Sequence, residues 1–174
     1  GRRLILEQQS GGGTEPSNAG CAEAMHAACA LGHVEFVEML LCSGAATAVG
    51  KTSEGRTPPM LALTSLRLGR DPQRVVDLLA ALLLGTVRVY LQAAQHFFGD
   101  RDARGNGVVH WAARVDAPHV VWEWIVRNAP SGELVADNQL NRTPLHIACL
   151  RRHPMSVTAL VEAIIKVTDG EDHA

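Results

Sequence analysis

Apolar residues recur at helical spacing in four stretches of the chain, and each stretch reads as two short helices separated by a turn. The first stretch covers residues 24–41, with Gly32 and His33 at its turn. The last covers residues 146–161, with His153 at the same point in the pattern. Apolar side chains three and four residues apart are typical of amphipathic helices. The pattern therefore predicts an all-α protein built from repeated helix-turn-helix units.

Two less regular units lie between these, at residues 57–79 and 107–125. One position recurs in all four units, where it holds His26, Met60, His110 and His146. These positions follow one another at steps of 34, 50 and 36 residues. The middle step exceeds a repeat of this kind by about 17 residues. We therefore expect an insertion between the second and third units.

The predicted helix starts have a local physical basis. Thr57 and Thr143 can act as N-caps, whose hydroxyl oxygens accept a backbone N–H that the first helical turn leaves unpaired. Pro58 and Pro144 follow at the position where a missing N–H costs nothing. Helices are therefore predicted to begin at these two points.

The motif Thr-Pro-Leu-His-Ile-Ala at residues 143–148, followed by Ala-rich and Val/Leu-rich helical segments, resembles the ankyrin-repeat family. The resemblance covers residues 20–174 and is weakest at 55–79, where Pro59 and Met60 replace the expected Leu and His. It implies a solenoid of about four repeats that stack on one another. The predicted repeats lie near residues 20–51, 52–85, 102–136 and 138–168.

Two segments depart from the repeat. We predict an inserted helix at 86–98 within an insertion at 86–101, ordered if Val87, Tyr90, Leu91 and Phe97 or Phe98 pack on neighbouring repeats. Part of the excess length also lies at 66–72, in the turn of the second repeat. Residues 1–19 are interpreted either as a flexible tail or as the remnant of a preceding repeat.

Composition and charge exclude several classes of function. The chain has 174 residues with a formal net charge of −2, so no overall field favours nucleic acid or an anionic membrane. Its most apolar stretch, residues 78–87, is too short to span a bilayer. The four cysteines show no paired spacing, which favours reduced thiols in a cytoplasmic or nuclear setting. Because the chain begins with Gly1, we expect it to belong to a longer protein.

Several groups suggest chemistry but fit the repeat better. Cys29 with His33, and Cys149 with His153, are four residues apart, yet both pairs fall at equivalent repeat positions. The recurring histidines are spaced along the stack, whereas a zinc ion needs its ligands gathered. The resemblance implies that they tie neighbouring turns together. Residues 50–52 copy the end of a phosphate-binding loop without its glycines or preceding strand. We expect no catalytic residue, no cofactor and no metal.

Two tryptophans of the third repeat cannot share a helical face, because Trp122 and Trp124 are two residues apart. One is expected in the core. The other is either half-buried by the insertion or exposed as a binding anchor.

The resemblance also implies a partner-binding concave face, formed by the turn tips and the exposed side of the inner helices. The residues predicted to bind a partner are Arg56, Arg104, Asn106, Arg114, Gln139, Arg142 and Arg151. Arginine predominates in this set, which favours a basic groove that takes an acidic or phosphorylated protein segment. The alternative is an ordinary solvated face with scattered arginines.

The function predicted is that of a monomeric, non-catalytic module that binds another protein. A second hypothesis makes the chain the regulatory or substrate-recruiting domain of a larger enzyme, such as a palmitoyltransferase, a kinase or a ubiquitin ligase. A third makes it an oligomerisation unit that uses residues 80–104.

Overall fold

The structure is a computed structural model that describes residues 18–44, 46, 50–87 and 93–171. Within these residues all regular structure is helical. The predicted tail at 1–19 falls outside the described residues except for its last two positions. The middle of the predicted helix at 86–98, residues 88–92, also lies outside them.

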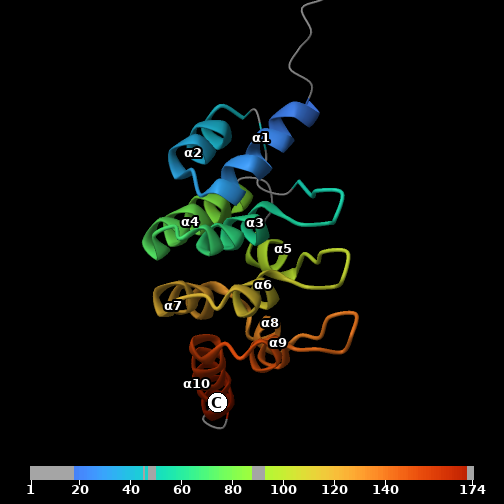
Figure 1. Cartoon of the computed structure of the whole chain (residues 1–174), viewed down its shortest axis with the longest axis vertical. Helices are drawn as coiled ribbons and strands as arrows, with labels where there is room; N and C mark the ends of the chain where they lie inside the picture. Colours follow the sequence, from blue (N-terminus) through green and yellow to red (C-terminus); the bar gives the residue numbers. More distant parts are fainter. Residues whose placement is uncertain (1–17, 45, 47–49, 88–92, 172–174) are drawn as a thin grey trace, which may run out of the picture.

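The described helices form four consecutive pairs, with short additional helices in the turn of the second pair, between the second and third pairs, and between the third and fourth. Their bounds are α1 Asn18–Leu31, α2 Val34–Cys42, α3 Pro58–Thr64, the 3₁₀ helix η1 Ser65–Leu68, α4 Pro72–Val87, α5 Ala93–Gly99, α6 Val108–Val115, α7 His119–Asn128, α8 Ser131–Val135, α9 Pro144–Arg151 and α10 Pro154–Glu171. The pairs lie one below another along the long axis of the molecule (Figure 1).

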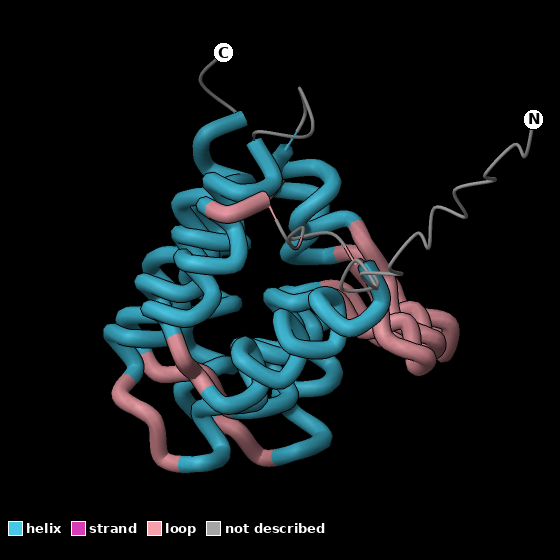
Figure 2. Tube along the Cα trace, turned by 90° about the horizontal axis from the view of Figure 1, so that it is seen from above, coloured by secondary structure: helices cyan, strands magenta, loops and turns pink. Residues whose placement is uncertain are grey.

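Two layers result from this arrangement. The first helices of the pairs, α1, α3, α6 and α9, pack on one another in order, and the second helices, α2, α4, α7 and α10, form the other layer. The turns that precede α3, α6 and α9 project together on one side, where they overlap when the molecule is viewed from above (Figure 2). The stack therefore places equivalent residues of successive pairs next to each other.

The two predicted N-caps behave differently. The Thr143 hydroxyl oxygen accepts the N–H of His146 at 3.3 Å and lies 2.8 Å from Nδ1 of the same histidine. Thr57 has the extended backbone of an N-cap residue, but its hydroxyl is buried and has no hydrogen-bond partner among the described residues. The predicted capping bond at Thr57 is therefore wrong. The residue three positions later is Met60, whose thioether cannot supply the bond that His146 makes.

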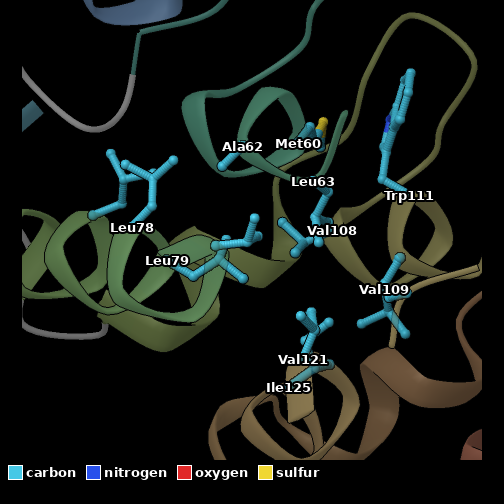
Figure 3. Close-up of a cluster of buried hydrophobic side chains, with 14 of the residues drawn as sticks. Met60, Ala62, Leu63, Leu78, Leu79, Val108, Val109, Trp111, Val121 and Ile125 are labelled. Carbon is cyan, nitrogen blue, oxygen red and sulfur yellow. The ribbon is translucent and has the colours of Figure 1, made fainter. Parts of the chain in front are cut away.

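The core lies between the two layers. Figure 3 shows its middle, where Met60 and Leu63 of α3 and Leu78 and Leu79 of α4 face Val108 and Val109 of α6 and Val121 and Ile125 of α7. All eight of these side chains are fully buried. Burial of one such side chain stabilises a fold by about 1.5–3 kcal/mol. Neighbouring pairs consequently hold each other in place through a continuous apolar interior.

The segment between the second and third pairs packs against both of them. α5 lies against α4 and α6, and the rings of Phe97 and Phe98 are buried. Both rings approach the ring of Trp124 on α7, at centroid distances of 6.0 and 6.1 Å. Trp124 is half-buried there, whereas Trp122 lies in the core, where its indole N–H donates to the Ser156 hydroxyl at 3.3 Å.

Two expectations about this segment need correction. Val87, which we expected to pack on a neighbouring repeat, is 56% exposed. Residues 86 and 87 also belong to the end of α4, because α4 continues beyond the predicted outer helix of the second repeat.

An ion pair anchors the end of the segment, since Arg101 lies 2.8 Å from the carboxylate of Glu133 on α8.

Candidate protein-interaction surface

The turns before α3, α6 and α9 share one stabilising device. A side-chain oxygen accepts the backbone N–H four residues later, at 3.1 Å for Thr52, 2.9 Å for Asp102 and 3.1 Å for Asn138. Short polar side chains commonly close turns in this way. The three turns therefore have the same internal scaffold although their sequences differ.

Backbone hydrogen bonds join each turn to the next. The N–H of Ala103 donates to the carbonyl of Glu54 at 2.9 Å, and the N–H of Gln139 donates to the carbonyl of Arg104 at 3.2 Å. The approach is close at Gly105, whose φ is +76° and whose position leaves no room for a side chain beside Gln139. The turns consequently form one connected ladder along the side of the stack.

Asp102 is the most heavily hydrogen-bonded side chain of the ladder. Its carboxylate accepts the backbone N–H groups of Arg104 and Asn106, the Asn106 amide group, and the indole N–H of Trp111, at 2.8–3.2 Å. The side-chain Oδ1 of Asn106 in turn accepts a bond from the side-chain amide Nδ2 of Asn138 at 2.8 Å. Burial by itself raises the pKa of Asp102, but these donors outweigh burial and hold the pKa below its ordinary value.

We expect Asp102 to make stability depend on pH. Because its folded-state pKa lies below the unfolded value, its contribution is complete above the unfolded pKa and is lost as pH falls through the folded pKa. Asp102→Asn should cost about 1–3 kcal/mol near pH 7, because an amide donor then faces the Asn106 and Trp111 donors. Urea unfolding of both proteins from pH 7 to pH 3 should show this difference shrink on acidification. A difference that stays constant over that range would contradict the assignment.

Histidines connect neighbouring turns at two of the recurring positions. His26 Nε2 lies 3.1 Å from the carbonyl oxygen of Gly50, and His110 Nε2 lies 3.1 Å from that of Arg142. The Nδ1 of His110 accepts the Gly107 N–H, so Nε2 carries the proton that it donates. Burial, the largest effect on this group, lowers the pKa of His110 and favours this neutral form. Met60 occupies the same position in the second pair, where a carbon–sulfur side chain fills the core instead.

Two arginines lie close to the ring of Trp111 beside the ladder. The guanidinium carbons of Arg56 and Arg114 are 4.9 and 5.0 Å from the centre of its ring. Cation–π attraction at such distances contributes about 0.5–1 kcal/mol at exposed sites. The bond from the indole to Asp102 fixes the ring, so the ring in turn restrains both guanidinium groups.

Two adjoining hollows border this arrangement. The first, of about 330 Å³, is lined by Ser53, Glu54, Arg56, Asp102, Ala103, Arg104, Trp111 and Arg114. The second, of about 200 Å³, is lined by Arg104, Asn106, Arg114, Asn138, Leu140, Arg142, Ile147, Leu150 and Arg151. We call the surface formed by these two hollows the basic face. Six of the seven residues predicted to bind a partner line it.

Two of the residues predicted to bind a partner form hydrogen bonds within the ladder. Gln139 is not among the residues that line the hollows, and its backbone joins two turns of the ladder. Asn106 lines the second hollow but is buried, and its side chain bonds to Asp102 and Asn138. Of the seven predicted residues, four are exposed and two are half-buried: Arg104, Gln139, Arg142 and Arg151 are exposed, and Arg56 and Arg114 are half-buried.

The charge of the basic face is only partly compensated. Five arginines line it against two carboxylates. Glu54 forms an ion pair with Arg56, and the oxygens of Asp102 accept protein donors. Arg104, Arg114 and Arg151 form no ion pair with any residue that the structure describes.

Arg114 is the centre of this uncompensated charge. Burial lowers the pKa of its guanidinium, and three neighbouring charges lower it further, those of Arg151, Arg104 and Arg56. Its Nε is buried and has no hydrogen-bond partner among the described residues. Leaving a buried donor unpaired costs about 1–3 kcal/mol, and more for a charged group. An anion bound beside Arg114 would offset the repulsion among these guanidinium groups.

No hydrogen bond joins Cys29 to His33 or Cys149 to His153 in the described part of the chain. Cys29 is buried, which raises the pKa of its thiol to about 12, and its partner in sequence, His33, is exposed. His153 Nδ1 lies 2.9 Å from the carbonyl oxygen of Ala113, so this histidine links two pairs of helices. Within the part of the chain that the structure describes, no helix is long and apolar enough to cross a membrane.

Sequence reasoning missed Trp111 and Asp102. The signal for Asp102 was its place in a repeated turn, eight residues before His110. Trp111 carried no comparable signal, because its contact with Arg56 joins two pairs of helices and arises only when they stack.

Comparison with known families gives one result, a match of the ankyrin repeat model to residues 24–50, which contain most of α1, all of α2 and the following turn. A search of curated proteins finds no match. The matched segment coincides with the first of the units read from the sequence. Residues 24–50 thus carry the sequence signature of an ankyrin repeat, in a chain whose described regular structure is helical.

Proposed function

We propose that this chain is a protein-interaction module that uses its basic face to hold an acidic segment of another protein. Ankyrin repeats generally mediate protein–protein interaction, which sets the class of function. The observation that carries the finer proposal is that four arginines line the hollows without ion pairs among the described residues, namely Arg104, Arg114, Arg142 and Arg151. Arginine forks bind carboxylates and phosphates through paired, charge-assisted hydrogen bonds.

The proposal includes the arrangement of repeats. The helix pairs are taken as four ankyrin repeats near residues 20–51, 52–85, 102–136 and 138–168, with an insertion at 86–101. On this reading the basic face lies on the concave side, over the turns and inner helices of repeats two to four. Its charge is local, because the chain as a whole has a formal net charge of −2. Binding is therefore expected to depend on this surface and to weaken as salt rises.

The test compares two triple variants with equal change in net charge. Arg104, Arg114 and Arg142 are changed together to Glu, and in the control Arg67, Arg74 and Arg127 are changed to Glu. The control residues are exposed and lie on η1, α4 and α7, outside the linings of the hollows. Binding of a fluorescent oligoglutamate peptide is measured by anisotropy at low and moderate salt.

We expect the first variant to lose at least about tenfold in affinity, the equivalent of 1.4 kcal/mol, and the control to stay within about twofold of the wild type. Circular dichroism checks that both variants are folded. Equal losses in the two variants would mean that net charge and not the basic face governs binding. Retained binding by the first variant would refute the proposal.

A further inference from the structure

We propose that the basic face holds a phosphoryl-binding site around Arg104 and Arg114, where its two hollows adjoin, for a phosphorylated side chain of the partner segment. This inference rests on the proposed function and makes it more specific. It names the phosphoryl group, in preference to a carboxylate, as the anion that the arginines around Arg114 recognise. It also names an apolar residue near that group in the partner as a second determinant.

The number of uncompensated donors favours phosphate. Arg104 and Arg114 line both hollows and Arg151 lines the second, and none of the three has an ion pair among the described residues. A carboxylate offers two oxygens and a single charge. A phosphorylated side chain offers three terminal oxygens and a charge of about −1.5 to −2 at neutral pH. One phosphoryl group can therefore pair with all three guanidinium groups, whereas one carboxylate leaves a guanidinium unpaired.

The donors are held in place before any ligand binds. The guanidinium group of Arg114 lies over the indole ring of Trp111. The indole N–H donates to the Asp102 carboxylate at 3.1 Å, which fixes the ring. The backbone of Arg104 is part of the ladder. Its N–H donates to the Asp102 carboxylate at 2.8 Å, and its carbonyl oxygen accepts the N–H of Gln139. Less side-chain freedom is lost on binding when donors are already ordered. The buried, unpaired Nε of Arg114 is an independent sign that the cluster lacks an acceptor.

An apolar shelf beside the arginines identifies the source of the phosphoryl group as a protein segment. Leu140 and Leu150 are 63% and 64% exposed, and both line the second hollow together with Ile147. A free phosphate or a phosphorylated amino acid leaves these side chains in water. A peptide that carries an apolar residue near its phosphorylated residue covers them, and burial of apolar surface adds to affinity.

The inference is tested with a defined pentapeptide, acetyl-Leu-Ala-phosphoserine-Ala-Leu-amide. Leucine on both sides makes the test independent of the direction in which the peptide lies. Three further peptides isolate each feature: one with serine, one with glutamate in place of phosphoserine, and one with alanine in place of both leucines. O-phosphoserine alone is the fifth probe. Calorimetry gives the affinity, and the indole N–H signals in ¹⁵N NMR spectra give the location. Trp111→Phe assigns the Trp111 signal among the three tryptophans.

The expected result is that the phosphopeptide shifts the Trp111 indole signal and binds at least about tenfold more tightly than the glutamate peptide. Arg114→Lys should lose most of this preference because lysine keeps the charge but not the fork. Arg127→Gln, on the opposite layer, should retain it. Leu140→Ala combined with Leu150→Ala should reduce affinity for the phosphopeptide to that of the leucine-free peptide, without affecting binding of O-phosphoserine.

Each contrary result has a defined meaning. If the glutamate peptide binds as tightly as the phosphopeptide, the phosphoryl inference is overturned while the acidic-segment proposal stands. If neither peptide binds and oligoglutamate also fails, both are overturned. If O-phosphoserine binds as tightly as the phosphopeptide, the apolar shelf has no role and the assignment to a protein segment is overturned.

Discussion

Gly105→Ala is expected to destabilise the protein by about 3 kcal/mol, within the upper range for single substitutions. Two effects add at this position. Gly105 has a φ of +76°, and a residue with a Cβ pays about 1–2 kcal/mol in this left-handed region. In addition, the new Cβ would lie 2.7 Å from the backbone nitrogen of Gln139, which cannot move without breaking the bond to the Arg104 carbonyl.

A second glycine provides a control that separates the two effects. Gly69 has a nearly identical φ of +73°, but nothing lies within 4 Å of a Cβ built there. Gly69→Ala should therefore cost only about 1–2 kcal/mol, the backbone contribution alone. Urea unfolding monitored by circular dichroism measures both variants. Equal losses would show that the close approach of the turns before α6 and α9 does not contribute to stability.

Phe98→Ala should cost about 3–5 kcal/mol, the range for truncation of a buried aromatic side chain. The Phe98 side chain is fully buried, and its ring lies against those of Phe97 and Trp124 at centroid distances of 4.9 and 6.1 Å. Its removal leaves a cavity between α5 and α7. We expect the fluorescence of Trp124 to shift toward longer wavelength as water reaches its ring.

Phe36→Ala is the matched control for this prediction. It removes the same side chain from α2, where Phe36 is 41% exposed, and should cost less than about 1 kcal/mol. Chemical unfolding gives the two free energies of unfolding under the same conditions. If both variants lose equally little, then the segment that contains α5 does not hold the stack together as its packing indicates.

The positions of the helices could be predicted from the sequence because helix formation depends on interactions between neighbouring residues. Apolar spacing, prolines and the N-cap at Thr143 predicted helices that the structure contains, since these effects act within one or two turns. The ankyrin resemblance rested on the same short-range features. The expected cap at Thr57 did not form, although Met60 has a backbone N–H at the position from which His146 donates to Thr143.

The candidate site was predictable only in part. The arginines could be placed on one face from the repeat, because equivalent positions of stacked units align. Whether acidic side chains would neutralise their charge could not be predicted, because Glu54 and Asp102 belong to different turns from most of the arginines. The hydrogen bonds that Asp102 accepts from Asn106 and Trp111 could be identified only from the folded structure.

The sequence by itself thus determined the short paired helices, because these follow from apolar spacing and turn residues. Tertiary structure decided what the basic face can do. Stacking brought Arg56 from another pair of helices to the ring of Trp111 and placed the guanidinium group of Arg151 near that of Arg114. Those relations join residues tens of positions apart, so they depend on how the pairs pack and on no local pattern.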